Sequence, residues 1–350
     1  MRHFVLLGVL LLVWPVAGAE LQFSFGDLGA SGSLTNFHSE LLGQGGPAAW
    51  KLLPGEAPSA FTQLSDPTKN LAGAGSVLAQ TSQDPADERF PMFVYDGEKF
   101  RNFRFATQFK LVSGSVEQMA GLVFRFQNTS NFYVVRVSGL GRNIRFYKVV
   151  DGARSVPVGT GCELAPGQWH QLAVQCDGNQ ITIWLDGKPA MPTLGDNTFD
   201  VGKIGFWTKS DSVTYYANAT ISYTPIISAA QRLVDGILRQ QPRILGLQIY
   251  VLDANDTMSI VASKDPSEKG QLGTFAELSA IREGTVSFGR DHGAALVTMP
   301  FHDRNGDVIA AVRFKLKSFF GETQDNAVGR ATLLLKLMQE TGLSAEDLAK

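Results

Sequence analysis

The stretch GLVFRFQNTSNFYVVRVS, residues 121–138, carries the strongest fold signal in the chain. It holds two runs of alternating apolar residues, separated by the turn formers Asn128 to Asn131. This pattern predicts an antiparallel β-hairpin in which Phe124 pairs with Val135. Side chains alternate between the faces of a strand, so one face of the hairpin is apolar and should line the core of a sandwich. That face comprises Leu122, Phe124, Phe126, Tyr133, Val135 and Val137.

The opposite face of the hairpin mixes apolar and polar side chains, namely Val123, Arg125, Gln127, Phe132, Val134 and Arg136. The next predicted strand covers residues 144–150 and returns beside this face. Its register places Arg145 beside Arg136 and Tyr147 beside Val134. We therefore expect three arginines, Arg125, Arg136 and Arg145, on neighbouring strands of one exposed surface.

Short alternating runs of the same kind recur from Leu21 to Tyr223, separated by Gly, Asn, Asp and Pro. This spacing is typical of an all-β sandwich, and no helical period of any length interrupts it. The other predicted strands are residues 103–112, 169–176, 181–187, 202–208 and 217–223. We expect long loops between Gly43 and Glu88, with one short strand at residues 76–81. The predicted sandwich domain covers residues 20–224.

Two tryptophans fall on the outward side of predicted strands. In ITIWLDG, residues 181–187, the isoleucines face inward and Trp184 outward; in GKIGFWT, residues 202–208, Trp207 faces outward. A flat indole beside planar polar groups suits the C–H faces and hydroxyl edges of a sugar ring. The alternative is that loops cover the indoles and the arginines only pair with carboxylates. The predicted saccharide site comprises Trp207, Trp184, Lys209, Asp211, Arg125, Arg136, Arg145, Tyr147 and Gln127.

Residues 1–19 have the features of a cleavable secretory signal. Arg2 and His3 precede an apolar run, and Ala17-Gly18-Ala19 supplies small residues at the cleavage site. No other stretch approaches the roughly 20 apolar residues of a membrane helix. We therefore expect an exported protein, periplasmic or extracellular. The net charge of −2 offers no basic field for nucleic acid.

The two cysteines, Cys162 and Cys176, flank a Pro-Gly turn at residues 166–167. A tight hairpin centred there places Cys162 opposite His170. Cys176 then lies about six residues further along, ~20 Å away at strand rise, which is beyond disulfide reach. We expect Cys176 to be a buried thiol; a disulfide is the alternative, because exported proteins can oxidise their cysteines.

The sequence character changes near Pro225. Ser228 is a predicted N-cap, and the segment that it begins has a helical apolar period up to Pro242. Four or five strands follow between residues 244 and 318, and a closing amphipathic helix is predicted from about Asp325 to Glu340. This order predicts an α+β domain over residues 225–350.

Five runs resemble the concanavalin A-like, laminin-G-like jelly-roll domains: LAQTSQD (78–84), YDGEKFRNFRF (95–105), residues 120–152, residues 169–188 and VGKIGFWTKSDSV (201–213). They are most similar to the bacterial 3-keto-disaccharide hydrolase group. This resemblance implies two antiparallel sheets and a carbohydrate-related role. The C-terminal domain is similar to the extracytoplasmic PAS-like Cache fold through residues 245–263 and 295–314.

The chain carries no familiar catalytic or metal-binding motif. The Glu-x-Asp-x-Glu carboxylate strand of jelly-roll glycosidases is absent, and no zinc-ligand spacing occurs. For an enzyme acting on a 3-keto sugar, Asp186, Asp211 and His170 are the nominal candidates, although His170 shares the parity of core residues. We expect no cofactor; acidic turns such as residues 303–306 are compatible with calcium but do not require it.

In the C-terminal domain, Arg290 could bind a carboxylate ligand bidentately, with Asp303 or Tyr250 nearby. The alternative is a solvated turn over residues 291–293. The sequence as a whole predicts an exported, non-catalytic protein that binds saccharide, with the C-terminal domain as a small-molecule sensor or assembly module. A 3-keto-disaccharide hydrolase is one alternative, and a structural protein that docks a protein partner is another.

Overall fold

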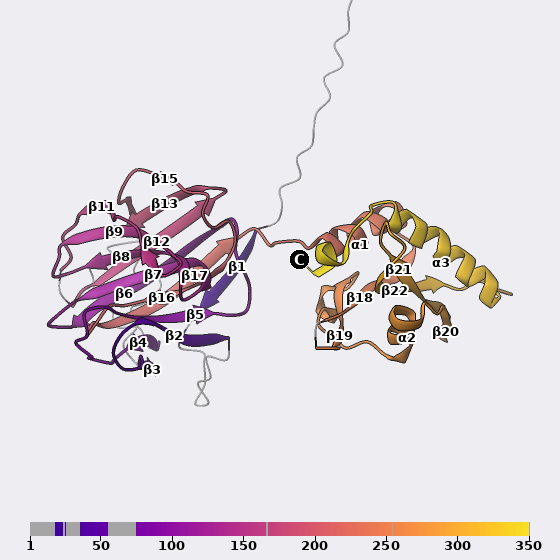
Figure 1. The fold of residues 1–350 in the computed structure, drawn as a ribbon, viewed down its shortest axis with the longest axis horizontal. Helices are drawn as coiled ribbons and strands as arrows, with labels where there is room; N and C mark the ends of the chain where they lie inside the picture. Colours follow the sequence, from indigo (N-terminus) through magenta and orange to yellow (C-terminus); the bar gives the residue numbers. More distant parts are fainter. Residues whose placement is uncertain are drawn as a thin grey trace, which may run out of the picture. The chain divides into compact units, whose positions relative to one another are not determined.

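The computed structural model describes residues 18–23, 25, 36–54, 75–165, 167–253 and 255–349. The chain divides into two compact units, residues 1–226 and residues 227–350 (Figure 1). Residues 1–17 of the predicted leader and 55–74 of the predicted loop region lie outside the described residues. In the part of the chain that is described, no helix has the length and apolar character needed to cross a membrane.

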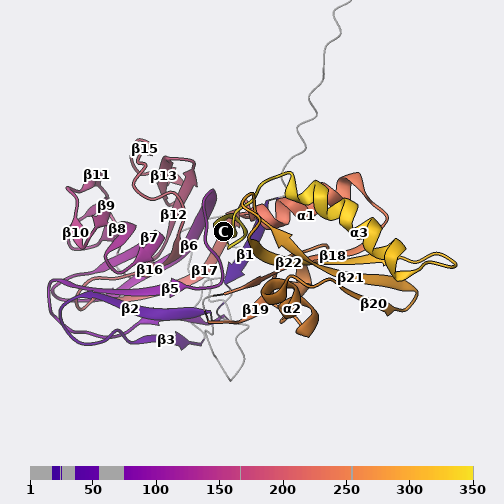
Figure 2. The ribbon, with the colours of Figure 1, turned by 45° about the vertical axis from the view of Figure 1, so that its right-hand side comes forward.

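The first unit is a sandwich of two antiparallel sheets, counted over the described residues (Figures 1 and 2). The nine-stranded sheet has the order β14 (Lys188–Pro189), β13 (Gln180–Leu185), β12 (Trp169–Asp177), β6 (Phe103–Ser113), β17 (Val213–Tyr223), β4 (Val77–Gln80) and β3 (Trp50–Leu53), with β1 (Ala19–Phe23) on β17 and β15 (Leu194–Gly195) on β13. The eight-stranded sheet has the order β10 (Ala153–Arg154), β9 (Asn143–Val150), β8 (Asn131–Ser138), β7 (Met119–Asn128), β16 (Lys203–Trp207), β5 (Arg89–Tyr95) and β2 (Phe37–Gly43), with β11 (Val158–Gly161) on β9. The predicted all-β sandwich is confirmed.

Apolar side chains fill the space between the sheets and also cover the outer face of the eight-stranded sheet. The inner core includes Leu122, Phe124 and Tyr133, all fully buried. The outer cluster comprises Phe90, Met92, Val94, Met119, Val123, Phe126, Phe132, Val134, Val149 and Trp207. A sheet face that is apolar but lies outside the main core is available for a ligand or a covering loop.

The register of β8 and β9 confirms one prediction: Arg136 pairs with Arg145, and Val134 with Tyr147. The register of β7 and β8 does not, because Phe124 pairs with Tyr133, two residues from the expected partner. The cause is a bulge that begins at Arg125, where φ is 47°: three residues of β7, positions 125–127, lie opposite Phe132 alone. Because the register differs from the predicted one by two residues, Phe124 and its partner still face the core, as predicted.

Beyond the bulge the faces exchange, which corrects the prediction for two side chains. Phe126 belongs to the outer cluster and not to the core. Arg125 turns away from the predicted surface and is 1% exposed. Its guanidinium donates to the carbonyl oxygens of Phe199, at 2.6 Å, and Gly178. These hydrogen bonds hold the loops that contain Phe199 and Gly178 against β7.

The two cysteines are free. Cys176 is buried, as predicted, and burial raises the pKa of its thiol to about 12. The predicted hairpin around residues 166–167 is wrong, because β11 joins the eight-stranded sheet whereas β12 belongs to the other sheet. Two strands from different layers cannot form a tight hairpin.

The second unit contains an antiparallel sheet of five described strands, in the order β19 (Met258–Ser263), β18 (Ile244–Leu252), β22 (Val308–Lys317), β21 (Ala294–His302) and β20 (Ser287–Asp291). Helices α1 (Ala229–Gln240) and α3 (Gln324–Gln339) cover one face, and α2 (Phe275–Glu283) covers the other (Figure 2). The short helices η2 (Pro266–Glu268) and α4 (Ala345–Ala349) complete the unit.

Local signals explain the helices of this unit. Ser228 caps α1 as predicted, and its hydroxyl accepts from the backbone N–H of Gln231 at 3.1 Å. The sequence analysis missed α2, although Thr274 and Glu277 form a capping box there. The α+β organisation expected for this part of the chain is observed.

Candidate ligand-binding pocket

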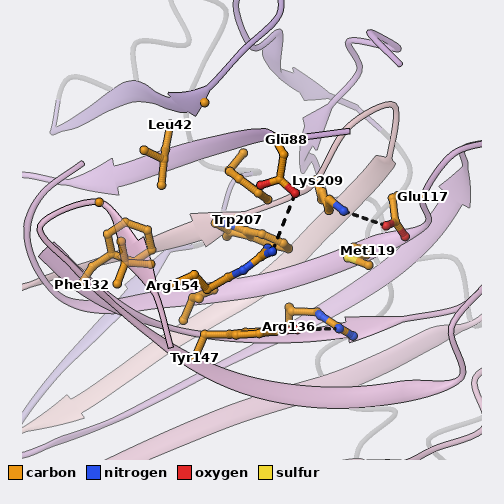
Figure 3. Close-up of a pocket in the computed structure, with 15 residues that line it drawn as sticks. Leu42, Glu88, Glu117, Met119, Phe132, Arg136, Tyr147, Arg154, Trp207 and Lys209 are labelled. Atoms are coloured by element: carbon orange, nitrogen blue, oxygen red, sulfur yellow. Dashed lines mark hydrogen bonds and ion pairs between the residues drawn. The ribbon is translucent and has the colours of Figure 1, made fainter. Parts of the chain in front are cut away.

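A pocket of about 310 Å³ lies on the outer face of the eight-stranded sheet (Figure 3). Seven strands and the turns next to them contribute to it, so the pocket runs across nearly the whole sheet. Its lining residues are Leu42, Gly43, Glu88, Phe90, Glu117, Met119, Phe132, Val134, Arg136, Tyr147, Val149, Gly152, Arg154, Trp207 and Lys209.

Trp207 lies at the centre of this surface (Figure 3). Its parity was predicted correctly, since it faces away from the core between the sheets, but its side chain is only 5% exposed. Phe90 of β5 stacks on the indole, with ring centroids 5.8 Å apart and an interplanar angle of 18°. The indole therefore forms an apolar wall of the pocket and not an open platform.

The backbone next to Trp207 is adapted to the indole. A Cβ atom on Gly121 of β7 would lie 2.9 Å from the indole Cε3 atom, so only glycine leaves this space. From the other sheet, the buried Tyr216 hydroxyl donates to the carbonyl oxygen of Trp207 at 2.7 Å. The backbone N–H of Gly121 donates to that hydroxyl at 3.1 Å. These hydrogen bonds hold the backbone of Trp207 and Gly121 in place from the side of the inner core.

Arg136 and Tyr147 form one side of the pocket. The Arg136 guanidinium donates to the Tyr147 hydroxyl at 3.0 Å and to Asn143 Oδ1, and its Cζ atom lies 5.6 Å from the centroid of the tyrosine ring. Arg136 is 9% exposed. Both hydrogen-bond partners are neutral, and no carboxylate of the described residues forms an ion pair with Arg136.

Arg154 lies over two aromatic rings of the pocket. Its guanidinium lies 5.4 Å from the centroid of the Tyr147 ring and 5.6 Å from that of Phe90. One nitrogen is 3.7 Å from Glu88 Oε1, and both side chains are about half exposed (Figure 3). This long, solvated ion pair is weak, so Arg154 can exchange its partner for a ligand at little cost.

Lys209 is the third cation of the pocket. Its ammonium donates to Asp87 Oδ1 at 2.7 Å and to Glu117 Oε1 at 3.0 Å. Burial lowers the pKa of Lys209, but the hydrogen bonds and charges of the two carboxylates outweigh this effect and raise it. Lys209 is therefore a charged group whose charge is already balanced.

Asp211 does not reach the pocket, and its carboxylate closes a loop instead. It accepts from the backbone N–H groups of Ser115 at 2.6 Å, Val116 at 3.1 Å and Glu117 at 2.9 Å, and from the Ser115 hydroxyl at 2.8 Å. Burial raises the pKa of Asp211, but these donors prevail and lower it to about 2. A carboxylate so satisfied is a poor general base, which corrects its assignment as a ligand or catalytic residue.

The other predicted site residues are dispersed. Trp184 lies in the nine-stranded sheet with Arg104 stacked 4.5 Å from its ring, so it cannot share a face with Trp207. Arg145 donates to the Thr160 carbonyl oxygen at 3.0 Å, and Gln127 to that of Val201. Of the nine residues predicted to bind saccharide, the pocket collects four: Trp207, Lys209, Arg136 and Tyr147.

The nominal catalytic pair also lies in the nine-stranded sheet. His170 Nδ1 is 2.8 Å from Asp186 Oδ2, and the backbone N–H of Gln171 donates to Asp186 Oδ1 at 2.8 Å. The ring of His170 stacks near Phe109 of the inner core, in agreement with its predicted core parity. Neither residue lines the pocket, and among the described residues no cluster of three His, Cys, Asp or Glu could bind a metal ion.

The residues predicted to bind a ligand in the second unit do not meet. Tyr250 pairs with Ala311 of β22, whereas Arg290 aligns through β21 with Leu316, roughly 17 Å further along β22. The Tyr250 hydroxyl donates to Gln248 Oε1 at 3.0 Å, and Arg290 donates to the Glu322 carbonyl oxygen at 2.7 Å. Asp303 closes its own turn by accepting from two backbone N–H groups.

Several pocket residues were missed from the sequence, chiefly Phe90, Arg154, Glu88 and Glu117. A signal for Phe90 existed, because RFPMFVY (89–95) is an almost continuous apolar run, as in a strand covered on both faces. Arg154 follows the tight turn after β9, and nothing local indicates that it folds back over Phe90.

Residues 49–222 match the family model of the 3-keto-alpha-glucoside-1,2-lyase-like domain. The matched segment lies within the sandwich unit, which is therefore similar to that family. No curated protein matches the chain.

Solved structures with a similar fold were also found. They include the carbohydrate-binding module CBM66 from Bacillus subtilis (18% identity, 49% of this chain and 94% of that chain, TM-score 0.37) and a native glycosidic hydrolase (10%, 60% and 98%, TM-score 0.38). A third is the galectin LEC-6 from Caenorhabditis elegans (9%, 35% and 84%, TM-score 0.29). At these scores the likeness carries no argument about function.

Proposed function

We propose that the protein is an exported saccharide-binding protein and that the pocket on the eight-stranded sheet holds the sugar. The observation that carries this proposal is the composition of the pocket. Four aromatic rings, those of Trp207, Phe90, Phe132 and Tyr147, adjoin three cations and two carboxylates in one concave surface. Its volume of about 310 Å³ lies at the lower end of the range for small-ligand sites, roughly 300–1,000 Å³.

The chemistry of a sugar ring fits these walls. Its C–H faces are apolar and pack on aromatic rings, while its hydroxyl groups both donate and accept hydrogen bonds. Glu88 and Glu117 can accept from hydroxyls, and Arg154 and Arg136 can donate to them. The match of residues 49–222 to a carbohydrate-related family supports the same ligand class.

Binding is favoured over cleavage by the state of the candidate catalytic groups. Both carboxylate oxygens of Asp211 accept hydrogen bonds from residues 115–117, and the pair formed by His170 and Asp186 lies in the other sheet. Cleavage of a 3-keto glycoside remains the alternative, and it would use Glu117 or Glu88 because these are the carboxylates of the pocket.

For the second unit, a PAS-like fold and a sensor or assembly role stay predictions. The five-stranded sheet with helices on both faces is compatible with that fold. Its function is open to test separately from that of the sandwich.

The proposal is tested by calorimetric titration of the full chain with mono- and disaccharides chosen from a glycan array. Tyr147→Ala should weaken binding about 10-fold or more, because it removes an aromatic wall and the hydrogen-bond partner of Arg136. The matched control is Trp184→Ala, an aromatic residue of the other sheet, which should bind as the wild type does. Loss of binding in Trp184→Ala alone would place the site elsewhere. Turnover of a 3-keto glucoside that disappears in Glu117→Gln would establish the enzyme instead.

A further inference from the structure

One cation of the pocket has no ion pair in the described part of the chain. Lys209 is paired with Asp87 and Glu117, and Arg154 is paired with Glu88. Arg136 has hydrogen bonds only to Asn143 and Tyr147, which are neutral. One positive charge in the pocket therefore lacks a carboxylate among the described residues.

This charge is also poorly solvated. Arg136 is 9% exposed, so its guanidinium has lost most of its water. A buried charge is costly unless a counter-ion or several hydrogen bonds compensate it. A guanidinium has five N–H donors, and the described partners of Arg136 use two side-chain acceptors. The cation–π contact with Tyr147 orients the group but supplies no counter-charge.

Arg136 also lies where a ligand in the pocket can reach it. Its side chain lines the same cavity as Trp207, and Tyr147 packs against it from β9 (Figure 3). A planar guanidinium in a fixed orientation matches an oxyanion through two parallel hydrogen bonds. Arg154, whose ion pair with Glu88 is long and exposed, lies over the same tyrosine ring and can add a second positive charge.

We propose that the ligand is an acidic saccharide and that Arg136 binds its anionic group. This inference rests on the proposed function and makes it more specific. The shared chemistry is an oxyanion on a sugar, which a uronic-acid carboxylate or a sulfate ester can supply. The neutral part of the sugar packs on the aromatic walls, and Arg136 discriminates the acid from its uncharged counterpart.

The test compares matched sugars by calorimetric titration of the full chain. The pairs are methyl glucuronide with methyl glucoside, and methyl galacturonide with methyl galactoside; galactose 6-sulfate is the sulfate arm. One acidic sugar should bind about 10- to 100-fold more tightly than its neutral counterpart, since a charged hydrogen-bonded pair contributes about that much. Its preference should fall as NaCl rises. Tighter binding of the sulfate than of both uronates assigns the ester as the source of the charge.

Substitutions of Arg136 distinguish the preference for acidic sugars from saccharide binding itself. Arg136→Gln should abolish the preference for acidic sugars, while neutral sugars still bind. Arg136→Lys should keep part of that preference, because lysine retains the positive charge but lacks the two parallel N–H donors of the guanidinium. Arg145→Gln, on the neighbouring strand but outside the pocket lining, is the matched control and should change nothing. Tryptophan fluorescence melts establish that each variant is folded.

The outcomes are distinct. Equal affinity for acidic and neutral sugars, unchanged in Arg136→Gln, would overturn the inference and leave saccharide binding intact. Absence of binding to either class would overturn the proposed function and the inference with it.

Discussion

Replacement of Asp211 by asparagine should destabilise the sandwich in a pH-dependent way. In the folded protein the pKa of Asp211 falls from an ordinary 3.8 to about 2. A depressed carboxyl pKa contributes stability that is fully present above about pH 4 and is lost as the pH falls towards 2. The difference of nearly two pH units corresponds to about 2 kcal/mol at pH 7, of which about 1 kcal/mol should be gone at pH 3.

Urea unfolding followed by tryptophan fluorescence measures this effect, because the second unit contains no tryptophan and the signal reports on the sandwich. Asp211→Asn should lower the free energy of unfolding by at least about 2 kcal/mol at pH 7. The asparagine NH2 group replaces one carboxylate oxygen, and it cannot accept a hydrogen bond from the backbone N–H groups of residues 115–117. At pH 3 the difference in free energy of unfolding between the wild type and the variant should be smaller by about 1 kcal/mol.

The matched control is Asp200→Asn. Asp200 forms a surface ion pair with Arg101, and both side chains are more than half exposed. Its replacement should change stability by less than about 0.5 kcal/mol at either pH. A fully stable Asp211→Asn protein, or one that loses sugar binding or turnover without losing stability, would refute the structural role of Asp211.

Three further predictions concern the thiols and the second unit. Cys176 should resist a thiol reagent in the native protein and react only on unfolding, which a labelling time course with and without urea will show. Ser228→Ala should cost about 1 kcal/mol of stability in the second unit, because the α1 cap is lost; unfolding followed by far-UV circular dichroism measures this. Glu277→Ala should cost about 3 kcal/mol by the same assay, since it leaves Arg313 without its buried carboxylate; a neutral effect would contradict that pairing.

Alternation was sufficient to predict most strands and the two faces of the central hairpin. It also placed Arg136 beside Arg145 and Tyr147 beside Val134, because antiparallel pairing follows from the turn position once the faces are known. The prediction failed beyond Arg125, where a bulge with a positive φ interrupts the ladder and the faces exchange. A bulge of that kind leaves no mark in a two-residue period.

The site was predicted in part for a similar reason. Parity could show that Trp207 lies outside the main core, but not that Phe90 would stack on it from β5. Parity could not show which sheet a strand joins, and so Trp184 was grouped with Trp207 although the two lie in different layers. The hydrogen bonds that bind Asp211 to residues 115–117 join segments almost a hundred positions apart, and only the folded chain brings them together.

A crystal structure of the full chain soaked with the acidic sugar that binds best tests the central claim most directly. The account predicts a sugar ring packed on the outer face of the eight-stranded sheet, against Tyr147 and Trp207, with its anionic group on Arg136. A sugar bound on the Trp184 face of the other sheet, or one whose anionic group lies away from Arg136, would contradict it.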